Sequence, residues 1–112
     1  MQNMQLEVIE REMGEGIKAG GQPLTEEGLG RIRIEIEDKM GVGPRNIRTS
    51  PIDRDYLEME VGILYPERQD GETLARVLES HLKPLKWWSV TVFLHPKTNR
   101  LIAEARRYKE SE

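Results

Sequence analysis

Two alternating segments near the C-terminus, joined by HPKTNR at residues 95–100, limit the possible folds of this chain more than any other feature. Pro96 presets φ for a tight turn, and Asn99 tolerates the left-handed backbone conformation that lets a chain enter a second strand. Neighbouring side chains of a strand point to opposite faces. The two segments therefore predict an antiparallel hairpin whose pairs can be counted outward from the turn.

Counting outward from a loop at residues 96–99 predicts two different faces. One face is almost wholly apolar, with the pairs Leu94–Leu101, Val92–Ala103, Val90–Ala105 and Trp88–Arg107. The other is mixed, with the pairs Phe93–Ile102, Thr91–Glu104, Ser89–Arg106 and Trp87–Tyr108. A slip of one residue would scramble both patterns, so their agreement supports this register. Trp88 is therefore assigned to the core and Trp87 to the outer face.

Three explanations of an outer-face tryptophan remain open. A helix of the same chain could cover this face, in which case Trp87 only packs. Alternatively, the face could bind a second subunit or a partner protein, because aromatic residues and Arg are enriched at the centres of interfaces. The candidate partner-binding residues are Trp87, Phe93, Ile102, Arg106 and Tyr108.

The third explanation is nucleic-acid binding by the same hairpin, with lysines and arginines on phosphates and an aromatic ring stacked on a base. Its candidate contacts are Lys83, Lys86, Arg100, Arg107 and Lys109. Residues 81–112 carry 7 basic and 3 acidic side chains, whereas residues 1–80 carry 10 basic and 17 acidic ones. The net charge of −3 is nevertheless unlike the basic character usual for nucleic-acid-binding domains, which favours the protein-binding interpretation.

Helical spacing marks the N-terminal part of the chain. Apolar Leu6, Ile9, Met13 and Ile17 recur at intervals of three or four residues, which predicts a helix over residues 4–18. The segment AGGQP at residues 19–23 then interrupts the chain with two glycines and a proline.

A second helix is predicted over residues 29–40, although the three isoleucines there also alternate as in a strand. The helix is favoured because Thr25 is a suitable N-cap, acidic residues follow it, and Gly41 stands where a helix commonly ends. If this interpretation is wrong, the sheet gains a strand.

The middle of the chain supplies a strand and another helix. Leu57, Met59, Val61 and Ile63 alternate with charged residues, which predicts a half-buried strand within residues 56–65. A short extended stretch before it contains Pro51 and is restricted to a sheet edge or a bulge. Residues 73–82 show an amphipathic helical stripe that ends before Pro84.

No catalytic, metal-binding or cofactor-binding set is recognisable by spacing. Asp53, Asp55, Glu58 and Glu60 lack the spacing of a calcium loop, and the glycine-rich GEGIKAGG lacks the spacing of a phosphate-binding loop. The two histidines, His81 and His95, each have a structural explanation near a helix end and a turn. We therefore expect no cofactor and no metal.

The length of 112 residues suits a single domain, residues 1–112, with its own core. There is no cysteine, secretory signal or long apolar stretch, so a cytoplasmic protein is the default expectation. The fold predicted is α+β: two N-terminal helices and a small antiparallel sheet of three to four strands, with a C-terminal hairpin and one intervening helix. The leading functional hypothesis is a non-enzymatic, self-associating interaction module that uses the outer face of the hairpin.

Overall fold

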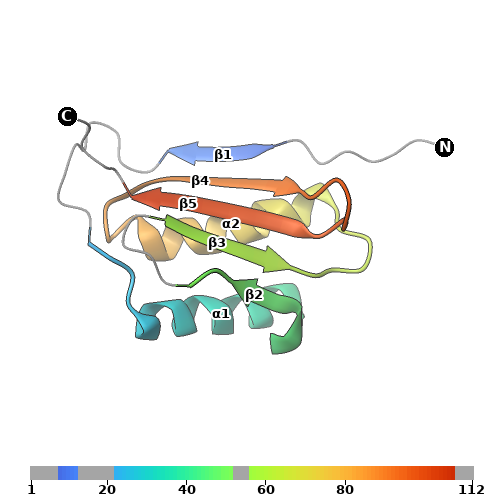
Figure 1. Ribbon diagram of the computed structural model, residues 1–112, viewed down its shortest axis with the longest axis horizontal. Helices are drawn as coiled ribbons and strands as arrows, with labels where there is room; N and C mark the ends of the chain where they lie inside the picture. The colour runs from blue at the N-terminus through green and yellow to red at the C-terminus, as the bar shows by residue number, and fades with distance from the viewer. Residues whose placement is uncertain (1–7, 13–21, 52–55, 108–112) are drawn as a thin grey trace.

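A computed structural model describes residues 8–12, 22–51 and 56–107 (Figure 1). The elements follow in the order β1 (Ile9–Glu12), α1 (Glu26–Met40), a short 3-10 helix (Pro44–Asn46), β2 (Ile47–Thr49), β3 (Tyr56–Val61), α2 (Arg68–Leu82), β4 (Trp87–Leu94) and β5 (Leu101–Arg107). The strands form one antiparallel sheet in the order β1-β4-β5-β3-β2. The α+β class is confirmed, but the sheet has five strands rather than three or four.

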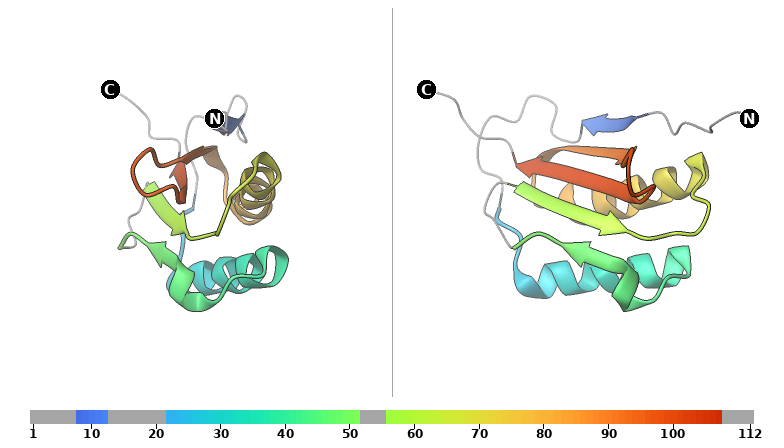
Figure 2. Two further views of the ribbon diagram at one scale, coloured as in Figure 1. Left: turned by 90° about the vertical axis from the view of Figure 1, so that its right-hand side faces the viewer. Right: turned by 45° about the vertical axis from the view of Figure 1, so that its right-hand side comes forward.

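Both helices lie on the same side of the sheet (Figure 2). The core between the two layers is made of apolar side chains from every strand and both helices, including Ile32, Ile36, Met59, Leu74, Leu78, Val90, Val92 and Leu101. No helix or strand in the described ranges lies on the opposite side of the sheet. Neither helix among these residues is long and apolar enough to cross a membrane.

The order helix, strand, strand occurs twice, first as α1-β2-β3 and then as α2-β4-β5. The second strand of each unit lies next to the other at the centre of the sheet, so β3 pairs with β5. β1 adds a further strand beside β4 at one edge, whereas β2 forms the opposite edge. The most interior strands are therefore β5 and its two neighbours, β4 and β3.

The helix predicted for residues 29–40 is confirmed as α1, and it begins directly after the predicted N-cap Thr25. The Thr25 hydroxyl accepts a hydrogen bond from the Gly28 N–H at 3.0 Å, which satisfies a backbone donor left unpaired at the helix start. Gly41 ends the helix with φ 66°, a left-handed conformation that glycine adopts without a steric penalty. The strand alternative for this segment is therefore excluded.

α2 begins at Arg68, five residues before the amphipathic stripe suggested. The Asp70 carboxylate accepts a hydrogen bond from the Glu67 N–H at 2.8 Å and thereby caps the first turn. Leu74, Leu78 and Leu82 then face the core, as the stripe predicted. The helix is followed by Pro84, which cannot donate a backbone hydrogen bond.

The C-terminal hairpin is confirmed in its turn and in most of its register. His95 N–H donates to the Arg100 carbonyl at 2.8 Å, and Asn99 has the left-handed φ of 61° that the turn requires. The observed pairs from Ser89–Arg106 to Leu94–Leu101 are those counted from the sequence. Pro51 likewise follows an edge strand, β2.

The predicted face of Trp87 is wrong. A bulge between Trp87 and Ser89 shifts the register, so Trp87 lies opposite Arg107, the partner predicted for Trp88. The extra residue of a bulge reverses the alternation beyond it. Trp87 consequently points to the helix side and is 0% exposed. The side chain of Trp88 and all of Tyr108 lie outside the described parts.

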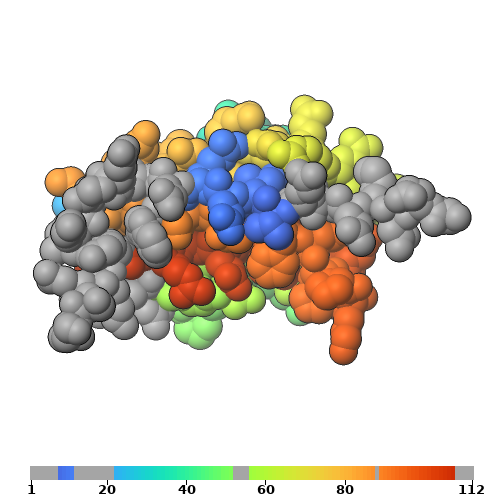
Figure 3. Space-filling model, turned by 90° about the horizontal axis from the view of Figure 1, so that it is seen from above, coloured from blue at the N-terminus to red at the C-terminus, as the bar shows by residue number. Residues whose placement is uncertain are grey.

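The helix predicted over residues 4–18 is wrong at its centre, where Ile9–Glu12 form β1. Seen from above, β1 lies along the edge of the sheet between α2 and β4 (Figure 3). Ile9 enters the core, and Arg11 on the same side binds the Glu72 carboxylate of α2 at 2.5 Å. The backbone groups offered by the edge of β4 therefore outweigh the local helical pattern. The remaining residues of that predicted helix, apart from Val8, are not described.

Candidate functional site

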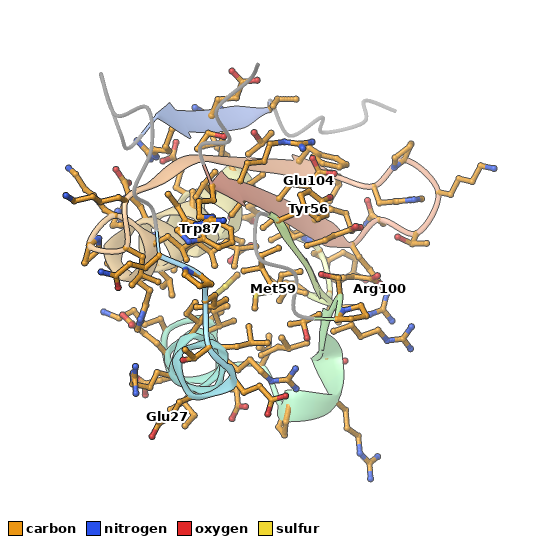
Figure 4. The ribbon with its side chains drawn as sticks, turned by 60° about the vertical axis from the view of Figure 1, so that its left-hand side comes forward. Glu27, Tyr56, Met59, Trp87, Arg100 and Glu104 are labelled. Carbon is orange, nitrogen blue, oxygen red and sulfur yellow. The ribbon has the colours of Figure 1, made fainter. Side chains whose placement is uncertain are left out.

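The surface that could bind a partner is the side of the sheet turned away from the helices. We call it the open face and define it by the outward-pointing residues of the five strands: Glu10, Arg48, Tyr56, Glu58, Glu60, Ser89, Thr91, Phe93, Ile102, Glu104 and Arg106. Figure 4 shows Tyr56, Glu104 and Arg100 on this side of the strands, and Trp87 and Met59 on the side of the helices. The outer face predicted for the hairpin is thus part of a wider surface, to which β1, β2 and β3 add five further residues.

A row of carboxylates crosses the open face. Glu10 of β1 lies opposite Thr91 of β4, Thr91 opposite Glu104 of β5, and Glu104 opposite Glu58 of β3. We call Glu10, Glu58 and Glu104 the acidic row. Like charges directly opposite on neighbouring strands destabilise a sheet. A cationic group that bound beside Glu58 and Glu104 would therefore relieve the repulsion between these two carboxylates.

Tyr56 and Arg106 lie beside the Glu58–Glu104 pair, at the end of the open face where β3 begins and β5 ends. The Arg106 guanidinium carbon lies 5.0 Å from the centre of the Tyr56 ring, within the range of a cation–π contact. The Tyr56 hydroxyl donates to the Glu58 carboxylate at 3.3 Å, and an Arg106 nitrogen lies 3.9 Å from the Glu104 carboxylate. Burial, followed by the charges of Glu104 and Glu58, raises the pKa of Tyr56 to about 12. The phenol therefore stays protonated and can donate a hydrogen bond throughout the physiological pH range.

The other end of the open face is apolar. Phe93 lies opposite Ile102, and Ile102 is only 3% exposed although it does not belong to the core between sheet and helices. Beside Ile102, Glu60 forms an ion pair with Arg100 at 3.3 Å. A Cβ at Gly62 would lie 2.8 Å from an Arg100 nitrogen, so glycine leaves room for this guanidinium. The open face thus combines the partly exposed ring of Phe93 with the acidic row.

The predicted partner-binding residues separate in the structure. Phe93, Ile102 and Arg106 lie on the open face as expected, whereas Trp87 is enclosed in the core and has no surface to offer. Tyr108 falls outside the described residues. Ile102 is itself only 3% exposed, so Phe93 and Arg106 remain the candidates with accessible side chains.

The alternative basic residues do not form one patch. Lys83 and Lys86 are exposed in the turn between α2 and β4, and Arg107 lies at the same end of the sheet, opposite Trp87. Arg100 precedes β5 at the far end, roughly 20 Å away at about 3.3 Å per strand residue, and pairs with Glu60. Lys109 lies beyond the described chain. A single phosphate-binding track along the hairpin is therefore not supported.

Sequence reasoning missed the contributions of Tyr56, Glu58 and Glu10 to this surface. The alternation of residues 56–61 showed that Glu58 and Glu60 share a face, but no local signal showed that β3 pairs with β5. Glu10 was expected in a helix. The acidic row exists only because three segments distant in sequence become neighbours in the sheet.

The histidines have structural partners. His81 Nε2 lies 2.6 Å from the Glu35 carboxylate and joins α2 to α1, while His95 Nδ1 accepts from the Lys97 N–H at 3.1 Å within the hairpin turn. No cluster of three or more His, Asp or Glu side chains in the described ranges is placed to hold a metal ion.

Two shallow hollows lie elsewhere on the described surface. One, between the start of α1 and β2, is lined by Glu26, Leu29, Gly30, Arg33, Thr49, Ser50 and Pro51. The other, between the β3–α2 loop and the hairpin turn, is lined by Asn46, Gly62, Ile63, Leu64, Tyr65, Thr98, Asn99 and Arg100. Neither lining contains a histidine or more than one carboxylate, so neither suggests acid–base catalysis.

Comparison with protein-family models, curated proteins and solved structures gives no match to this chain, so its site is interpreted from its own geometry.

Proposed function

We propose that this chain is a non-enzymatic protein-interaction module and that the open face is its binding surface. The observation that carries the proposal is that both helices lie on one side of the sheet, which leaves the other side without a covering element among the described residues. An uncovered sheet face that combines a partly exposed aromatic ring, Phe93, with charged side chains resembles the composition of a protein interface.

The charges on the open face indicate the chemistry of the partner. Glu58 is exposed and opposes Glu104, and Arg106 contacts the latter only at 3.9 Å. A lysine or arginine brought between the two carboxylates would relieve their repulsion. The same carboxylates would repel phosphates, so nucleic acid is the less favoured ligand of this face. The partner surface should therefore be basic, with an apolar group to contact the partly exposed ring of Phe93.

A peptide titration tests this proposal. The probe is a short dye-labelled peptide that alternates lysine and valine, and its binding is followed by fluorescence anisotropy. We expect the combined substitutions Glu58→Gln and Glu104→Gln to weaken binding by about tenfold or more, because two charged contacts are lost. A peptide that alternates glutamate and valine should not bind.

The matched control carries Glu27→Gln and Asp38→Asn on α1, which remove the same charge from exposed positions elsewhere. It should bind the lysine peptide as the unchanged protein does. Equal losses in both variants would mean that the peptide senses only total charge, and this result would overturn the proposal. Absence of binding to the unchanged protein would also count against it.

A further inference from the structure

The turn between α2 and β4, KPLK at residues 83–86, presents two lysines at one end of the molecule. Lys83 and Lys86 are both exposed, and neither forms an ion pair with any residue in the described ranges. Lys86 has φ 64°, a left-handed conformation that is uncommon for a residue with a side chain. Such conformations persist only where the surrounding structure imposes them.

Hydrogen bonds hold this lysine turn in place. The Leu85 N–H donates to the Leu82 carbonyl at 3.0 Å, and the Lys86 N–H donates to the Lys83 carbonyl at 2.9 Å. The Leu85 carbonyl in turn accepts from the Gln22 N–H at 2.8 Å. The backbone of this turn therefore loses little conformational entropy when it binds, and it holds the two lysines side by side at the surface.

The acidic row offers the complementary charges. Glu10 and Glu58 are exposed, and no ion pair joins either of them to another described residue. A symmetric dimer that placed two open faces together would bring carboxylates against carboxylates. The open face also carries Arg48 and Arg106, but Arg106 already contacts Tyr56 and Glu104. The lysine turn of a second copy is a basic surface without such contacts, and its two ammonium groups are complementary in charge to the acidic row.

We infer that the partner of the open face is a second copy of this chain, which inserts Lys83 and Lys86 of its lysine turn beside Glu58 and Glu104 of the first. This inference rests on the proposed function and names its partner. The two contact surfaces are different, so the contact is head-to-tail. Each copy uses its lysine turn to bind one neighbour and its open face to bind another. Such contacts close into rings or continue as filaments.

Reciprocal charge reversal tests the inference by sedimentation velocity. The turn variant carries Lys83→Glu and Lys86→Glu, and the face variant carries Glu58→Lys and Glu104→Lys. We expect the unchanged protein to associate, with association weakening as salt rises, and each variant alone to need about tenfold or more protein to associate. An equimolar mixture should associate again, because the acidic turn of one variant then meets the basic face of the other, and the basic turn of the second meets the acidic face of the first.

A control variant with Arg76→Glu and Lys97→Glu makes the same charge change at exposed positions of α2 and the hairpin turn, and it should associate normally. Circular dichroism shows which variants are folded. A single chain that carries all four substitutions should also associate again, because its acidic turn meets the basic face of the next copy. The inference is overturned if the mixture stays monomeric or if both variants associate unchanged. If the unchanged protein is monomeric yet binds the lysine–valine peptide, the inference fails while the proposed function stands; if it also fails to bind the peptide, both fail.

Discussion

The indole Nε1 of Trp87 donates a hydrogen bond to the main-chain carbonyl of Gln22 at 2.7 Å. This bond joins the start of β4 to the segment that leads into α1, 65 residues away in sequence. The ring itself is 0% exposed and packs with the core. Trp87 therefore links the two helix–strand–strand units and stabilises the fold. Its enclosed ring is not accessible to a partner.

Removal of this ring should destabilise the protein strongly. We expect Trp87→Ala to lower the free energy of unfolding by about 3–5 kcal/mol, because a large buried side chain is replaced by a cavity. Urea denaturation followed by circular dichroism measures the change. Ile34→Ala, at a side chain that is 66% exposed on α1, should change it by less than about 0.5 kcal/mol. A stable Trp87→Ala protein would contradict the enclosed position.

Neutralising one member of the Glu58–Glu104 pair should stabilise the isolated protein. We expect Glu58→Gln to raise the free energy of unfolding by about 0.2–1 kcal/mol, because two opposed carboxylates no longer repel each other. The gain should shrink in high salt, which screens exposed charges. The same substitution weakens peptide binding in the proposed function. A loss of stability would show that the repulsion is already compensated within the chain.

The Tyr56 hydroxyl should ionise at a higher pH than that of an ordinary tyrosine. Its pKa is about 12 in the folded protein, against 10.0 for an ordinary tyrosine, because of burial and the charges of Glu104 and Glu58. The folded state therefore holds this proton more tightly than the unfolded state does. The resulting stabilisation is present below about pH 10 and is lost as the pH rises from about 10 to 12.

Ultraviolet absorbance of tyrosinate measures this titration, and Tyr56→Phe identifies which part of the signal belongs to Tyr56. In Glu104→Gln the midpoint should fall only part of the way towards 10.0, because burial is the largest cause of the shift. A midpoint for Tyr56 near 10.0 in the unchanged protein would mean that the hydroxyl is open to water.

The contact between the two helices should be measurable as a coupling energy. His81 Nε2 lies 2.6 Å from Glu35 Oε1, and their side chains are 24% and 32% exposed. A double-mutant cycle with His81→Gln and Glu35→Gln should give a coupling of about 0.2–1 kcal/mol, the range of partly exposed pairs. Additive effects would show that the two side chains act independently. Lys39 lies 3.7 Å from the same carboxylate. Part of the stability change caused by Glu35→Gln therefore comes from the loss of the Lys39 contact rather than of the His81 contact.

Local sequence signals were sufficient where the interactions themselves are local. Thr25 and Gly41 are positioned by the turns that they cap, so α1 could be recognised despite the competing alternation of its isoleucines. The turn around Asn99 and the alternation on either side determine the hairpin register from Ser89 to Leu94 in the same way. Phe93, Ile102 and Arg106 could therefore be assigned to one surface from the sequence alone.

Only the tertiary structure decided the position of Trp87, the strand at Ile9–Glu12 and the acidic row. One extra residue in β4 reverses which tryptophan is enclosed, and the sequence carries no mark of that bulge. β1 forms because the edge of β4 supplies backbone partners to a segment whose own pattern is helical. Glu10, Glu104 and Glu58 become neighbours because strands far apart in sequence pair, and pairing at that distance depends on the packing of the whole sheet rather than on adjacent residues.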